Sequence, residues 1–147
     1  MNKTAMVLLF LAAGLLVAPS LMVAHHAEAN FDHDSLWVMT GTVTQMDFVN
    51  PHIIVHLDVK NKAGQYESWV ATTSSPNAMR RYGWTPNSVK AGDQIVITGF
   101  LDYEGRKIIQ MAKNVINGKE LEVSTTAATQ LHEYKQRNPN KPAKNYN

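Results

Sequence analysis

The stretch LWVMTGTVTQMDFV, residues 36–49, is rich in Thr, Val, Trp, Met and Phe, which favour β-strands. Its apolar side chains fall into two sets: Leu36 and Val38 share the parity of Met46 and Phe48, whereas Trp37, Met39 and Val43 take the other parity. Gly41 lies where this alternation changes phase. A long strand with an internal glycine that swaps faces is typical of a strand shared between two sheets of a small barrel. The stretch therefore predicts the first strand of such a barrel.

The residues that follow predict two more strands and then a short helix. In HIIVHLDV, residues 52–59, every odd position is apolar, so we expect the odd face to point into the core. A third strand is predicted over residues 66–73. Ser75 and Pro76 are typical of a helix start and Gly83 of a helix stop, which places a short helix directly after this strand.

Two further strands complete the predicted domain, over residues 94–101 and 107–116, and residues 120–123 add a short sixth strand. Three strands, one helix and a two-strand hairpin is the order of an OB-fold, a five-stranded, partly open barrel. We therefore predict an all-β domain with one short helix, an OB-like five-stranded barrel over residues 35–123. The competing fold is a β-sandwich, which does not ordinarily need a capped helix at that point.

Residues 124–147 are predicted to lie outside the barrel, as a short helix over 125–137 followed by a disordered basic tail. This part of the chain carries a net charge of +3, whereas residues 25–123 carry −2. An acidic body with a basic tail does not suit a phosphate backbone, so no nucleic-acid partner is expected.

The beginning of the chain is typical of a signal peptide over residues 1–24. Lys3 precedes an apolar run, residues 5–17, that is shorter than the ~20 residues of a membrane-spanning helix. We expect cleavage after Ala24 and a periplasmic or secreted protein without a membrane span in its mature chain. Cleavage after Ala29 is the alternative, because an Ala-x-Ala pattern also ends there. The chain has no cysteine, which excludes disulfides, thiolate metal sites and a lipidated cysteine.

Histidines are the residues that suggest chemistry. After cleavage at Ala24, a His/Asp-rich leader over residues 25–34 would begin with His25, whose α-amine and imidazole can chelate one ion, and His26 follows. His52 and His56 are four residues apart on one strand, about 13 Å at ~3.3 Å per residue, so both cannot hold one ion. We therefore predict a copper or zinc site formed by the residues His25, His26 and His52.

A second interpretation gives these histidines no ligand. His25 and His26 would be solvated, and His52, which follows Asn50-Pro51, would bond a turn carbonyl and fix the bend. The protein would then be a metal-free OB-like domain that binds a protein of the cell envelope. The sequence has no glycine-rich phosphate loop, no G-x-S-x-G and no H-E-x-x-H, so both interpretations predict a binding module and not an enzyme.

Several short motifs occur in a fixed order along the chain. They are Ala24-His25-His26, Thr40-Gly41-Thr42-Val43, Asn50-Pro51-His52, Ser75-Pro76-Asn77, Gly83-Trp84 and Lys90-x-Gly92-Asp93. As an ordered set over residues 24–116, they resemble a family of small exported bacterial proteins grouped as a domain of unknown function. The resemblance implies one exported β-barrel domain and supplies no activity.

Overall fold

The computed structural model describes residues 30–147, and the structural statements below refer to these residues. The predicted signal peptide, its cleavage after Ala24 or Ala29, and the residues His25 and His26 lie outside the described residues.

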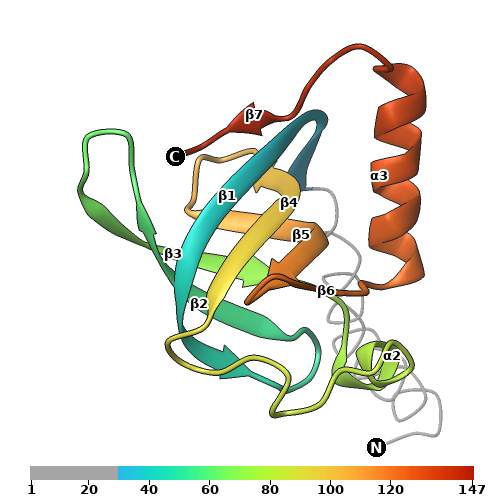
Figure 1. The fold of residues 1–147 in the computed structure, drawn as a ribbon. Helices are drawn as coiled ribbons and strands as arrows, with labels where there is room; N and C mark the ends of the chain where they lie inside the picture. The colour runs from blue at the N-terminus through green and yellow to red at the C-terminus, as the bar shows by residue number, and fades with distance from the viewer. Residues whose placement is uncertain (1–29) are drawn as a thin grey trace, which may run out of the picture. The chain divides into compact units, whose positions relative to one another are not determined.

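Five of the strands form a closed ring (Figure 1). The elements are β1 (Phe31–Asp47), β2 (Ile54–Lys60), β3 (Tyr66–Thr72), α2 (Pro76–Arg80), β4 (Gln94–Asp102), β5 (Ile108–Ile116), β6 (Lys119–Leu121), α3 (Thr125–Arg137) and β7 (Lys144–Asn145). Around the ring, β1 pairs with β2, β2 with β3, β3 with β5, β5 with β4, and β4 with β1. Only the β3–β5 pairing of the ring is parallel. This order, with α2 between β3 and β4, confirms the predicted OB-like fold.

The interior of the ring is the main hydrophobic core. Val55, Leu57 and Val59 on β2 are at most 1% exposed, which confirms that the odd face of this strand points inward. The helix α2 begins after Ser75, whose hydroxyl accepts a hydrogen bond from the Ala78 amide at 3.4 Å. Buried side chains of Met79 and Trp84 belong to the same core, so α2 and the turn after it close one end of the ring (Figure 1).

The change of face in β1 does not occur at Gly41, as the sequence predicted. It occurs at a bulge between Val43 and Gln45, after which Met46 packs against the core that Val43 also enters. Gly41 itself is buried, and a Cβ there would lie only 3.0 Å from Cγ2 of Val59. The glycine is therefore needed for the close approach of β1 and β2, whereas the bulge supplies the face switch.

The predicted leader over residues 25–34 is wrong at its end, because β1 begins at Phe31. Phe31 is buried and pairs with Asp102 of β4. The ring of His33 lies edge-on to Phe100, with centroids 4.8 Å apart, and its Nε2 lies 3.0 Å from Oε1 of Gln110. These partners on β4 and β5 hold the segment on the outside of the ring, so the domain begins before residue 35.

The predicted helix over residues 125–137 is present as α3, and it covers a second apolar cluster. Tyr134 is 1% exposed and packs with four side chains on the outer face of the ring, Phe31, Leu36, Phe100 and Ala112. Figure 1 shows α3 running along one side of the ring, next to β1, β4 and β5. The helix is thus part of the folded domain and not an appendage.

The prediction of a disordered tail is wrong as well. The strand β7 pairs in parallel with β1, the Tyr146 amide donates to the Val38 carbonyl at 2.9 Å, and the Asn147 side chain bonds the backbone N and O of Thr40. This part of β1 has a free edge, since β2 pairs only with residues 42–47. Backbone groups on that edge need partners, and the tail supplies them.

The tail ends on a polar cluster around Glu67 of β3. Its carboxylate accepts hydrogen bonds from the Tyr146 hydroxyl at 2.5 Å and from Nδ2 of Asn61 at 2.9 Å, and it pairs with Nζ of Lys107 at 3.0 Å. These contacts, the one to Tyr146 foremost, lower the pKa of Glu67 to about 2. The Tyr146 ring also lies edge-on to Trp69, with centroids 4.8 Å apart.

The Glu67 cluster predicts how the fold responds to acid. Because the folded-state pKa is lowered from 4.5 to about 2, the stabilisation is complete above about pH 4.5 and is lost as the pH falls toward 2. We expect Glu67→Gln to lower the melting temperature at neutral pH, and the difference from the parent protein to shrink in thermal melts at successively lower pH. Glu133→Gln on the exposed side of α3 is the control. A difference between Glu67→Gln and the parent that stays constant with pH would contradict this assignment.

Candidate functional site

Two segments that are distant in sequence meet at the end of the ring closed by α2. The loop between β1 and β2, residues 48–53, contains the cis peptide bond Asn50-Pro51. Its Ile53 exchanges backbone hydrogen bonds with residues 73–74, and the guanidinium of Arg80 lies 5.3 Å from the ring centroid of Phe48. The Asn50-Pro51-His52 motif and the Ser75-Pro76-Asn77 motif are therefore neighbours, and we call this region the α2 end.

His52 lies exposed at the α2 end, with one ring nitrogen engaged. Its Nδ1 lies 3.2 Å from the backbone carbonyl oxygen of Thr73. Because a carbonyl can only accept, Nδ1 carries the proton, and in the neutral imidazole Nε2 is then the unprotonated nitrogen with a free lone pair. Metal-ligating histidines usually show this arrangement, in which the other ring nitrogen donates to a backbone carbonyl or a carboxylate. The hydrogen bond joins His52 to the residue directly after β3 and not to a carbonyl of the Asn50-Pro51 turn.

His56 is engaged differently, on the outer face of β2. Its Nε2 lies 2.9 Å from Oδ2 of Asp47, and Nε2 of Gln45 donates to the other oxygen of Asp47 at 2.5 Å. The hydrogen bonds from Gln45 and His56 lower the pKa of Asp47. The contact of His56 with Asp47 depends on the register of β1 against β2, so it is not apparent from the local sequence.

Within residues 30–147, no three side chains of the His, Asp or Glu type gather in a way that could hold a metal ion. Of the predicted site residues His25, His26 and His52, only His52 belongs to the described part of the chain. His33, His52 and His56 each have a separate partner, namely Gln110, Thr73 and Asp47. If a metal site exists, donors outside the described residues must complete it.

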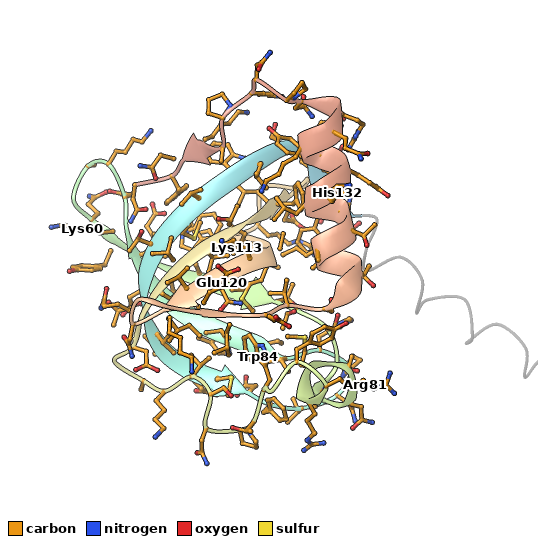
Figure 2. All side chains as sticks on the ribbon, turned by 45° about the vertical axis from the view of Figure 1, so that its right-hand side comes forward. Lys60, Arg81, Trp84, Lys113, Glu120 and His132 are labelled. Carbon is orange, nitrogen blue, oxygen red and sulfur yellow. The ribbon has the colours of Figure 1, made fainter. Side chains whose placement is uncertain are left out.

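Trp84, from the Gly83-Trp84 motif, has a structural role at the α2 end. Its side chain is 1% exposed, and its indole Nε1 donates to the Glu122 carbonyl at 2.7 Å. Figure 2 shows Trp84 turned inward, whereas Arg81 points away from the ring. The tryptophan thus connects the α2 end to the segment that leads from β6 into α3.

A family model matches residues 14–109, which is more than half of the chain and includes β1 to β4 together with α2. The chain belongs to the family of unknown function DUF6152. This assignment confirms the resemblance inferred from the ordered motifs. The comparison with curated proteins finds no match. Membership of DUF6152 therefore gives the chain relatives but no assigned activity.

Two solved structures resemble this DUF6152 protein. One is the ZRD-deleted mutant of TiaS in complex with agmatine, at 15% identity and a TM-score of 0.41, over 54% of this chain and 20% of that chain. The other is yeast Stn1 and Ten1, at 11% identity and a TM-score of 0.39, over 71% of this chain and 52% of that chain. Neither helix in the described part of the DUF6152 chain has the length and apolar character needed to cross a membrane.

Proposed function

We propose that the protein is an exported, non-catalytic binding module for a copper or zinc ion. The proposal is carried by one observation at the α2 end. His52 is exposed, its Nδ1 is bonded to the Thr73 carbonyl, and its Nε2 is left with a free lone pair. An imidazole oriented in this way is suited to serve as one nitrogen donor.

The other proposed donors belong to the mature amino terminus. After cleavage at Ala24, the α-amine and the imidazole of His25 would form a chelate, and His26 would add a further imidazole. Nitrogen donors of this kind suit Cu(II) best, and Zn(II) binds to the same donors. A carboxylate cluster or a thiolate is not needed for such a site.

The test is a Cu(II) titration of protein isolated after export, with the amino terminus determined by intact mass. We expect one equivalent to bind, and adding one residue ahead of His25 to weaken the affinity by about tenfold or more, because the α-amine then leaves the chelate. The variant His52→Gln should weaken it as well. The affinity should also fall as the pH drops through the imidazole range near ~6.5.

His132→Gln is the matched control, because this histidine lies exposed on α3 (Figure 2) and its ring bonds, among residues 30–147, to the Gln136 side chain alone. It should leave copper binding unchanged. A mature chain that begins at Asn30, or native and extended termini that bind copper equally, would overturn the proposal. The metal-free domain that binds an envelope protein would then be the better description.

A further inference from the structure

A groove of about 540 Å³ lies on the outside of the ring, away from the α2 end. One wall is the second half of α3, another is the segment that leads to β7, and the floor is formed by β1, β4 and β5. Leu36 and Val38 of β1 and Leu131 of α3 give it an apolar lining, together with two prolines of the connecting segment. Its volume is in the range of small-molecule sites.

The charged side chains that line the groove are all lysines, Lys113, Lys135 and Lys141, and none of the described lining residues carries a carboxylate. Lys113 is neutralised by Glu120 at 2.8 Å, and Figure 2 shows the two side chains beside each other. Lys141 donates to the backbone oxygen of Asp34 at 2.9 Å and keeps its charge.

The side-chain ammonium group of Lys135 makes no hydrogen bond or ion pair with any of the described residues. The carboxylate of Asp34 is already paired with Arg137 at 3.0 Å, so it does not neutralise Lys141. The groove therefore has two positive charges without an anionic partner. Together they exceed the roughly half negative charge of the C-terminal end of α3.

Tyr134 adds a polar group to this region. It lines the groove, and its hydroxyl is buried with no hydrogen-bond partner among the described residues. A buried hydroxyl without a partner is destabilising, but this one is closed off from solvent, so a molecule in the groove does not reach it unless the tyrosine moves. The features that the groove offers to a ligand are thus its apolar lining and its unpaired positive charge.

We propose that this groove binds a free medium-chain carboxylate. The hydrocarbon chain lies on Leu36, Val38 and Leu131, and the carboxylate lies between Lys135 and Lys141. A single hydrocarbon chain with one anionic group needs an apolar surface next to positive charge, and the groove supplies both. This site is independent of the proposed metal site, because it shares no residue with the α2 end.

The first test compares two amphiphiles of equal chain length, sodium decanoate and decyltrimethylammonium, each titrated into the purified protein below its micelle concentration. Binding is measured by calorimetry and mapped by ¹⁵N NMR. We expect decanoate to bind at least about fivefold more tightly and to perturb the amides of α3 and of residues 36–38. Added salt should reduce the difference.

Two variants locate the site. Thr98→Phe on β4 fills the groove from its floor and should abolish decanoate binding. The double variant Lys135→Gln/Lys141→Gln should weaken decanoate binding by about three- to tenfold while leaving decyltrimethylammonium binding equal or stronger. Lys119→Gln on β6, an exposed lysine that does not line the groove, is the control and should bind like the parent. Melting temperatures verify that each variant is folded.

Three results would overturn the proposal. The first is equal binding of the two amphiphiles, which would mean apolar adsorption only. The second is the absence of decanoate binding up to its solubility, or perturbed amides confined to other parts of the protein. The third is binding to phosphatidylglycerol vesicles without binding to decanoate, which would assign the lysines to a membrane surface.

Discussion

Replacing Val55 by aspartate is expected to unfold the protein. Val55 is 0% exposed and lies on β2 between Met46 of β1 and Ala71 of β3, so a carboxylate there would have no partner in the core. Burying an unpaired charge costs several kcal/mol, which is a large part of the ~5–15 kcal/mol that stabilises a typical domain. Circular dichroism and the dispersion of the NMR spectrum at 25 °C measure the loss.

The adjacent position on β2 provides the control. The side chain of His56 is 39% exposed and bonds Asp47, so His56→Gln removes one surface contact and should cost about 1 kcal/mol or less. Equal loss of stability in the two variants would mean that the inner and outer faces of β2 are assigned wrongly.

Truncation after Val123 should lower the melting temperature by at least about 15 °C. The truncation removes Tyr134, which is 1% exposed, and uncovers Phe31, Leu36 and Phe100 on the outer face of the ring. Deleting one large buried aromatic side chain alone costs about 3–5 kcal/mol, and here α3 and the whole tail are lost with it. Differential scanning calorimetry gives the difference directly.

Two point variants show how much of the loss in melting temperature comes from Tyr134 alone. Tyr134→Ala should account for a large part of the destabilisation, whereas Glu133→Ala, at an exposed position of the same helix, should change the melting temperature little. A truncated chain that melts within a few degrees of the parent protein would mean that residues 124–147 do not contribute to the stability of the folded domain.

The features that were predicted correctly from the sequence are those that depend on residues close together in the chain. The alternation in residues 52–59 identified β2 and its inner face, and the Ser75-Pro76 start and Gly83 stop placed α2 between the third and fourth strands. A short helix was also predicted over residues 125–137, and α3 has these bounds. Strand order then follows from the order of the elements, because few folds place one helix between three strands and a hairpin.

The errors concern contacts between residues far apart in the chain. The tail is too polar to be read as a packed segment, yet Tyr146 reaches Glu67, 79 positions away. The end of the leader is held by β4 and β5, and the face switch of β1 is a bulge defined only by the pairing with β2. None of these partners is visible in a local window of sequence.

In the candidate site, too, local features were predicted and contacts between distant residues were not. That His52 bonds a turn carbonyl was predicted from its place after Asn50-Pro51, but the carbonyl belongs to Thr73, which the pairing of β2 with β3 brings close. Likewise, the groove beside α3 could not be predicted from the sequence, because it is formed by the packing of α3 and the tail on the ring. Its lysines appeared in the sequence only as part of a basic tail.

The short pairing of β7 with β1 has a consequence for the behaviour of the protein in concentrated solution. An uncovered strand edge is a template on which another chain can add, and it is a common origin of aggregation. Here the backbone amide of Tyr146 and the side-chain amide of Asn147 occupy that edge, at Val38 and Thr40 respectively. By covering the edge of β1, Tyr146 and Asn147 therefore prevent a strand of a neighbouring copy from pairing there. Their polar surroundings in the sequence do not indicate this role.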